Sequence, residues 1–376
     1  MKVELIAKAV PFFFTLIGIE ILLNFITKKN YYRLNDSIND LSCGISQQVF
    51  EIFGKILVIG AYIFIYSKFA LFNIPLDSPI AWVLCFILVD LGYYWFHRAS
   101  HEISFIWGSH IPHHQSEEYN LTVALRQGTF ENVFSSFFYL PLALIGFNPI
   151  MFISCHQIDT IYQFWVHTRF VNRIGFLEII LNTPSHHRVH HGKNPIYIDK
   201  NYGGFFIIWD KIFGTYQEET EEVVYGTVVP LSSFNPIWAN IHYWIELFKK
   251  SANSKGFNKL KVFFRKPGWN PESKDYAYEI PYVSADTYQK YDPKTPLWVN
   301  IYVLLQFIPI TTIATYFLDH NFRFNNSEKF IITFFIFLGL INLGALLENK
   351  KWAYISEIMR IFLFMGIFIY FKQLYI

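Results

Sequence analysis

The chain has 376 residues, of which 53% are hydrophobic, 20% aromatic and only 16% charged. Soluble domains usually carry about 25% charged residues, so this composition excludes an ordinary water-soluble globular protein. The net charge of +2, without a basic run, gives no reason to expect nucleic-acid binding. Cys43, Cys85 and Cys155 lie far apart, which indicates core thiols and not a disulfide framework or a zinc site.

Long apolar runs predict membrane-spanning helices, since about 20 apolar residues cross the hydrocarbon core. No small-residue cleavage site follows the first run, so we expect a helix there and not a removable signal peptide. The stretch 130–167 breaks at Gly146-Phe147-Asn148-Pro149 and predicts a helical hairpin that need not cross fully. The predicted spans, in chain order, are 4–27, 48–71, 79–96, 297–318, 329–347 and 353–371.

A polar region, residues 168–295, separates two groups of spans and is expected in water or against the lipid headgroups. Lys28, Lys29 and Arg33 follow the first span, and the region 249–274 is rich in Lys and Arg. By the positive-inside rule, these charges predict a cap in the cytoplasm, at the inner membrane of a bacterium or the endoplasmic reticulum of a eukaryote. The expected fold is an all-α, multi-pass integral membrane protein with a cytoplasmic histidine-rich cap. Its expected parts are N-terminal spanning helices (1–78), a catalytic region with the cap (79–295) and C-terminal spanning helices (296–376).

Eleven of the 13 histidines fall between residues 97 and 191, and most of them form three clusters. Residues at i, i+3 and i+4 share a helix face, so their imidazoles can converge on one ion. Pro112 predicts that a helix starts there, with His110 just before it. Eight clustered histidines exceed the four ligands of a structural zinc site, which predicts two metal ions. The expected core ligands are His97, His101, His110, His113, His114, His187, His190 and His191.

The metal that these clusters bind follows from the ligand type and the surroundings. Imidazole suits zinc, copper, iron and nickel. Few carboxylates lie in the same stretch, which argues against the Glu-rich soluble di-iron bundles. Two redox-active irons beside a lipid pool favour the use of dioxygen against a C–H bond of a lipid. The alternatives are a metal transporter or storage protein, with ligands near the membrane midplane, and an inactive protein that keeps the fold.

Further polar residues near the clusters have less specific signals. His167 ends the predicted hairpin, level with the clusters, and is the expected ninth ligand. His156 lies 11 residues earlier, about 16 Å along a helix, so a hydrogen bond between helices is an equal interpretation. His242 and His320 are expected at the surface. The residues expected to support the ligands are His156, Asp159, His186 and Glu118.

The histidine motifs resemble those of the fatty acid hydroxylase/sterol desaturase superfamily of integral-membrane di-iron proteins. That superfamily carries His-x3-His followed by two His-x2-His-His motifs, as this chain does from His97 to His191. Within it, the flanking segments are most similar to the members that oxidise glyceryl ethers. These segments are 97–102, 116–127, 162–168, 182–192 and 199–215, and the strong motifs cover about 90–270.

This resemblance implies hydroxylation of the carbon next to the ether oxygen of an alkylglycerol, with release of a fatty aldehyde. Sterol, fatty-acid or carotenoid hydroxylases and desaturases of the same superfamily remain the alternative. The implied cofactors are two Fe, O2 and tetrahydrobiopterin or another external reductant. The chain has no His-Pro-Gly-Gly haem motif, so the electrons are expected from a free reductant or a separate electron-donor protein. Glu102, Glu117 and Asn120 are the expected pterin contacts.

Overall fold

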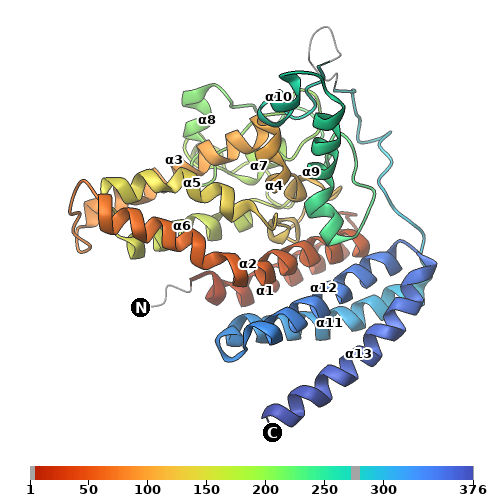
Figure 1. Ribbon diagram of the computed structural model, residues 1–376. Helices are drawn as coiled ribbons and strands as arrows, with labels where there is room; N and C mark the ends of the chain where they lie inside the picture. The colour runs from red at the N-terminus through yellow and green to blue at the C-terminus, as the bar shows by residue number, and fades with distance from the viewer. Residues whose placement is uncertain (1–4, 272–279, 376) are drawn as a thin grey trace.

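The computed structural model describes residues 5–271 and 280–375, which fold into helices joined by loops (Figure 1). These residues form no β-strand; two isolated antiparallel bridges join Leu181 to Phe206 and Gly192 to Tyr225. The expected all-α fold is confirmed.

The α-helices are α1 (Leu5–Ile26), α2 (Leu34–Phe69), α3 (Pro79–Glu102), α4 (Ser104–His114), α5 (Glu131–Ile145), α6 (Pro149–Trp165), α7 (Pro184–His190), α8 (Ile208–Phe213), α9 (Pro236–Asn253), α10 (Asn258–Phe264), α11 (Leu297–His320), α12 (Asn326–Leu347) and α13 (Lys351–Tyr375). Short 3-10 helices are η1 (Val123–Leu125), η2 (Gly175–Ile179) and η3 (Asn321–Arg323).

In the described chain, four helices are long and apolar enough to cross a membrane: α1, α3, α11 and α12. Helix α2 adds a fifth span if its two parts, which bend by 46° between Gly54 and Val58, count as one. The chain is therefore a multi-pass membrane protein. The predicted span at 353–371 is helical as α13, but α13 is not one of these four helices. Figure 1 shows α11, α12 and α13 gathered beside α1 and α2.

The second predicted helix begins earlier than the sequence indicated. The second span was predicted at 48–71, but α2 already begins at Leu34. Its first turns carry the buried residues Asp36 and Asp40. These carboxylates are tolerated because the loop after α4 supplies their partners: Ser116 donates to Asp36, and Thr122 Oγ1 donates to Asp40 at 2.8 Å.

The predicted hairpin at 130–167 is confirmed as α5 and α6, with its break where the sequence placed it. Gly146 ends α5 with φ +116°, and a Cβ there would lie 2.0 Å from the Phe72 carbonyl oxygen. Asn148 caps α6 by accepting from the Ile150 amide at 2.9 Å. With 17 residues, α6 is about 26 Å long, shorter than the roughly 30 Å hydrocarbon core.

Candidate metal centre

Nine buried histidines converge in two groups, and they are the nine histidines that the sequence indicated. Within each group, the ligand nitrogens all lie within 4.8 Å of one another. The members come from α3, from α4, from the residue pair after α6, and from α7 with its C-cap. The first group is His97, His101, His110, His114 and His190; the second is His113, His167, His187 and His191.

Each His-x2-His-His motif divides its histidines between the two groups. In α4, His110 and His114 are four residues apart and face the first group, while His113 faces the second. At α7 the order is reversed, because His187 and His191 face the second group and His190 the first. Adjacent residues differ by about 100° around a helix, so one short helix can serve two ions.

The prediction that a helix starts at Pro112 was wrong, because α4 begins at Ser104 and holds Pro112 in its last turn. Proline cannot donate to the carbonyl of Gly108, but only two residues of helix follow it, so little of the ladder is lost. A Cβ on Gly108 would lie 2.3 Å from the indole nitrogen of Trp244. Because α4 begins at Ser104, His110 lies inside the helix, one turn before His114. The sequence interpretation had placed His110 just outside the helix.

Hydrogen bonds at the outer ring nitrogens orient the imidazoles. Carbonyl oxygens only accept, so each Nδ1 that faces one carries the proton and leaves a lone pair on Nε2. The Nδ1 atoms of His97 and His113 face the carbonyls of Tyr202 and Arg126 at 2.7 and 2.8 Å. The Nδ1 atoms of His167 and His190 face the carbonyls of Gln163 and Lys200 at 2.8 and 2.9 Å.

The inner nitrogens lie close together, and those of His113, His167 and His190 present lone pairs, an arrangement that a bound cation would stabilise. The Nε2 atoms of His113 and His167 lie 3.2 Å apart, and those of His167 and His187 lie 3.0 Å apart. The Nε2 atoms of His114 and His190 lie 3.2 Å apart. Within the described residues, Nε2 of His97 and of His101 is buried without a hydrogen-bond partner. Both groups therefore fit a divalent metal that prefers imidazole.

Burial keeps several of the clustered imidazoles neutral. It lowers the pKa of His113 to about 4 and that of His190 to about 3. Burial and the neighbouring imidazoles also hold the pKa values of His114, His187 and His191 well below the ordinary range. These side chains are therefore uncharged near pH 7, the form that binds a metal ion.

Two carboxylates that lie beside the clustered histidines were not predicted from the sequence. Glu131, at the start of α5, places Oε1 3.1 Å from His110 Nδ1, and Asp199 places Oδ1 3.8 Å from His101 Nδ1. Asp199 and Asn201 adopt positive φ angles of 59° and 55° on either side of Lys200, whose carbonyl faces His190. An acidic residue in a first helical turn usually reflects the helix dipole, so Glu131 carried no distinct signal.

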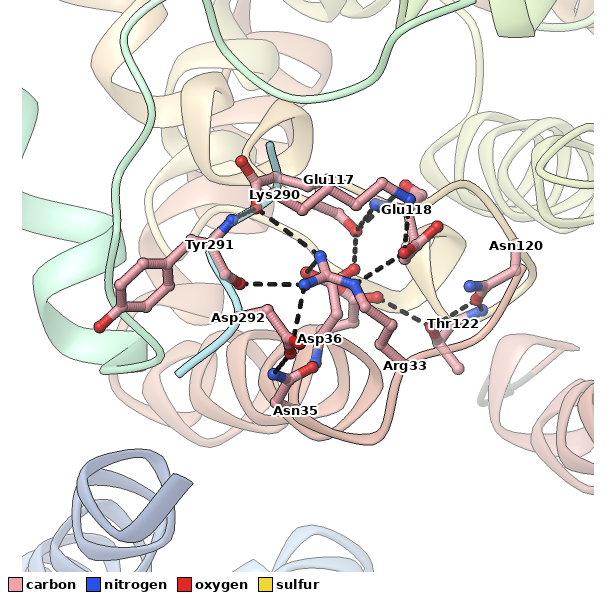
Figure 2. A network of polar contacts seen from close by, with 12 residues as sticks. Arg33, Asn35, Asp36, Glu117, Glu118, Asn120, Thr122, Lys290, Tyr291 and Asp292 are labelled. Carbon is pink, nitrogen blue, oxygen red and sulfur yellow. Dashed lines mark hydrogen bonds and ion pairs between the residues drawn. The ribbon is translucent and has the colours of Figure 1, made fainter. Parts of the chain in front are cut away.

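Glu117, Glu118 and Asn120 lie in a network of polar contacts that holds the loop after α4 (Figure 2). The Tyr291 amide donates to Glu117 at 2.6 Å, and Tyr288 donates to its other oxygen. Arg33 and Lys290 donate to Glu118 at 2.7 and 2.6 Å. The side chain of Asn120 donates to the Tyr31 carbonyl at 2.7 Å. The network joins segment 288–292 and the start of α2 to the loop that directly follows His113 and His114.

The remaining candidates lie outside both histidine groups. Glu102 pairs with Arg98 at 3.2 Å and is partly exposed at the end of α3. His156 packs against Tyr139, with ring centroids 5.1 Å apart, and Asp159 accepts from Gln163 at 2.9 Å. His186 is buried in α7 and packs against the ring of Tyr216.

The expectation that His242 lies at the surface was wrong. His242 is buried, and its Nδ1 faces the carbonyls of Trp238 and Ala239 at 3.1 and 3.2 Å. Histidine in a mixed apolar and charged helix such as α9 does not reveal from sequence which face packs inward.

Comparison with known proteins identifies the family. Residues 82–215 match the fatty acid hydroxylase family model, and residues 299–375 match the alkylglycerol monooxygenase C-terminal domain. The chain is 39% identical over 370 residues to alkylglycerol monooxygenase of Homo sapiens, covering 97% of this chain and 82% of that protein. It is 36% identical over 365 residues to the Xenopus tropicalis protein of the same name, covering 96% and 81%.

The chain belongs to the alkylglycerol monooxygenase family. It is a membrane lipid monooxygenase, which confirms the expected enzyme class, and its histidine groups indicate that it binds metal. The likeness to ornithine lipid hydroxylase of Rhizobium tropici, 29% over 145 residues, covers 38% of this chain and 44% of that protein. No solved structure matches the chain.

Proposed function

We propose that the chain hydroxylates the carbon next to the ether oxygen of an alkylglycerol. The observation that carries this proposal is the similarity, over nearly the whole chain, to proteins named alkylglycerol monooxygenase. In the balanced reaction, O2, two electrons and two protons give one hydroxylated ether carbon and one water. The resulting hemiacetal breaks its bond to the glycerol oxygen, which leaves a fatty aldehyde and a glycerol derivative.

Nine histidines are the proposed ligands of two irons, five in the first group and four in the second. Bound iron supplies the activation of dioxygen that oxidation of a C–H bond requires. The chain itself holds imidazoles such as those of His113 and His190 neutral and fixes several rings through Nδ1 hydrogen bonds. It also keeps bulk water away, since none of the nine is more than 7% exposed. Exclusion of water protects a reactive site from side reactions.

The proposed electron source is a tetrahydropterin or a separate electron-donor protein. Of the three residues proposed to contact a pterin, Glu117 and Asn120 are buried in the network of Figure 2. Glu102 is the accessible one, with 32% of its side chain exposed beside Lys266. A contact between Glu102 and the reductant is therefore compatible with its position at the end of α3.

The site is proposed to face the cytoplasm. Lys28, Lys29 and Arg33 lie between α1 and α2, and Arg33 contacts the loop after the second histidine cluster. This contact supports a location of the positive charges and the histidines on one membrane face.

A Glu222→Cys variant tests this orientation, because Glu222 is exposed on the cap and Cys43, Cys85 and Cys155 are buried. An impermeant maleimide should label it only from the cytoplasmic side, and labelling from the opposite side alone would reverse the orientation.

The function is tested with purified, iron-loaded protein in lipid nanodiscs. Alkylglycerol with tetrahydropterin should yield fatty aldehyde, and a His114→Ala variant should yield none. A monoacylglycerol of equal chain length and a sterol serve as controls, because neither has a glyceryl ether. Oxidation of a sterol or fatty acid without aldehyde from any glyceryl ether would reject the ether substrate and favour another hydroxylase or desaturase of the superfamily.

A further inference from the structure

Two short segments of the cap form one unit, here called the wedge: residues 174–181, which contain η2, and residues 205–213, which contain α8. The Ile207 amide donates to the Ile180 carbonyl at 2.9 Å, and Leu181 and Phe206 form an antiparallel bridge. Lys211 Nζ donates to the carbonyls of Glu178 and Ile179 at 3.0 and 2.8 Å, at the end of η2. Nothing in the wedge is long enough to span a membrane.

The wedge lies beside α3 well before the end of that helix. Phe205 packs against Phe86 with ring centroids 5.0 Å apart, and Phe213 packs against Trp95 at 4.9 Å. Helix α3 is a candidate span from Pro79 to Glu102. Phe86 lies 16 residues before Glu102, which is about 24 Å along the helix axis. The contacts therefore place the wedge at the depth of the apolar part of a spanning helix.

Non-helical backbone at that depth requires polar partners from the protein, because lipid offers none. Asp90 of α3 supplies them: it accepts from the amides of Phe205 and Phe206 at 2.7 and 3.2 Å and from the Trp209 indole at 2.7 Å. The charged side chains of the wedge also have polar partners in the protein, and Asp210 accepts from the amides of Tyr202 and Gly203, both at 2.7 Å. Glu178 accepts from the Ile174 amide at 2.9 Å, and Lys211 is held by the two carbonyls named above. This pattern explains a buried carboxylate in the middle of an apolar helix.

The outer face of the wedge is apolar. Phe176, Ile179 and Ile212 are 79%, 63% and 60% exposed. This face continues into the lipid-facing side of α3, because Phe213 touches Trp95, which is itself 40% exposed. Exposed apolar surface that continues the surface of a spanning helix is matched by acyl chains and not by water.

We infer that the wedge is inserted into the bilayer, with its apolar face among the acyl chains of the leaflet next to the histidine groups. Its position differs from the expectation that all of residues 168–295 lie outside the hydrocarbon. Both segments lead directly into the metal centre: Asn182 precedes α7, and the Tyr202 carbonyl faces His97 Nδ1. Insertion thus brings membrane lipid beside the histidines, so the lipid need not pass through a water-filled channel. The inference does not depend on which lipid is oxidised.

Spin labels at single introduced cysteines test the insertion in nanodiscs. The variants Ile179→Cys and Ile212→Cys report on the wedge, Leu84→Cys on the lipid-facing side of α3, and Glu222→Cys on the aqueous cap. The three native cysteines are buried, so the unmodified chain gives the labelling background. The measurement is the ratio of collision rates with oxygen, which concentrates in lipid, and with a water-soluble nickel chelate.

Insertion predicts ratios at residues 179 and 212 that lie within about twofold of the ratio at residue 84 and several-fold above that at residue 222. Ratios equal to that at residue 222 would place the wedge in water and overturn the inference. Low collision rates with both reagents would show a protein surface, such as a second copy, over this face and would overturn it as well. Metal content and thermal unfolding of each variant establish that it is folded.

Discussion

At the residue scale, an outer hydrogen bond orients the inner nitrogen of several of the clustered imidazoles. The Nδ1 of His110 is within hydrogen-bond distance of the Glu131 carboxylate, at 3.1 Å, whereas Asp199 Oδ1 lies 3.8 Å from His101 Nδ1. A carboxylate raises the basicity of a ligand histidine and fixes its ring more strongly than a carbonyl does. Loss of this partner should therefore weaken the ion in the first group more than the ion in the second.

A Glu131→Ala variant should bind the first-group metal about 10- to 100-fold more weakly, the usual effect of removing such a partner. Competition with a chelator, followed by metal analysis, measures the affinity. Glu131→Gln keeps an acceptor and should restore part of it. The control is Glu246→Ala, since Glu246 is exposed on α9. Equal metal affinity in Glu131→Ala and Glu246→Ala would show that the contact to His110 does not support the ion.

Substitution of single histidines separates ligands from packing residues. His167→Ala removes one of four nitrogens from the second group, so metal content should fall from about two ions per chain to about one. His156→Ala should keep about two, because His156 packs against Tyr139 outside both groups. Metal analysis of both purified variants decides this. Loss of an ion from His156→Ala, with His167→Ala unchanged, would reverse the two assignments.

The histidines could be predicted because their spacing is local, whereas their supports could not. His110, His113 and His114 lie within one helical turn or so, and that pattern is visible in the sequence. Glu131 lies 21 positions from His110, and Arg126 lies 86 positions from its partner Asp40. The carbonyls that orient His97 and His190 belong to Tyr202 and Lys200, and a backbone acceptor leaves no side-chain signal.

At the element scale, apolar runs predicted helices well, but two helix starts were predicted too late in the chain. Helix α2 extends back into a polar stretch because Asp36 and Asp40 find partners in the loop after α4. Helix α4 continues through Pro112 because the helix ends soon after it. Both errors concern helices that adjoin the loop after α4, and this loop directly follows His113 and His114.

Gly44 permits one such approach, between α2 and η1. A Cβ at Gly44 would lie 2.1 Å from the Leu125 carbonyl oxygen. Gly44→Ala should therefore push η1 away and lower the unfolding temperature by several degrees, in line with a loss of roughly 1–3 kcal/mol for overpacking. The matched control is Gly60→Ala in the same helix, where nothing in the described chain lies within 4 Å of the added Cβ.

Thermal unfolding in nanodiscs measures both variants. Gly60→Ala should be neutral or slightly more stable, because alanine favours a helix by about 1 kcal/mol over glycine. Equal unfolding temperatures for the two variants would mean that α2 and η1 can separate freely. A loss of metal from Gly44→Ala alone would further link this contact to the histidine loop, which leads from His114 to η1.

At the scale of the whole molecule, the C-terminal helices are joined to the metal centre through segment 288–292. That segment precedes α11 and contacts Glu117 and Glu118, while Arg33 donates to the Tyr291 carbonyl at 2.9 Å. The loop that follows the second histidine cluster is thus held by both the N-terminal and the C-terminal parts of the chain. Such long-range pairing is set by the fold and not by any local pattern.

Stability should consequently depend on the charge state of the buried histidines. His113 and His190 have pKa values of about 4 and about 3 in the folded protein, against an ordinary value near 6.5. Below pH 6.5, the unfolded chain binds protons that the folded chain does not. The contribution of these two histidines to the free energy of unfolding of the metal-free protein is therefore fully present above about pH 6.5. It is lost as the pH falls toward 4, by up to about 1.4 kcal/mol per pH unit for each histidine.

The unfolding temperature of chelator-treated protein should thus fall between pH 7 and pH 5, whereas metal-loaded protein should resist until protons displace the ions at lower pH. A His113→Gln/His190→Gln variant, which cannot titrate at these positions, should show a shallower decline when metal-free. If the metal-free parent is as stable at pH 5 as at pH 7, the histidines are not held neutral by burial. If parent and variant decline equally, the acid sensitivity arises elsewhere, and these two side chains do not couple metal binding to folding.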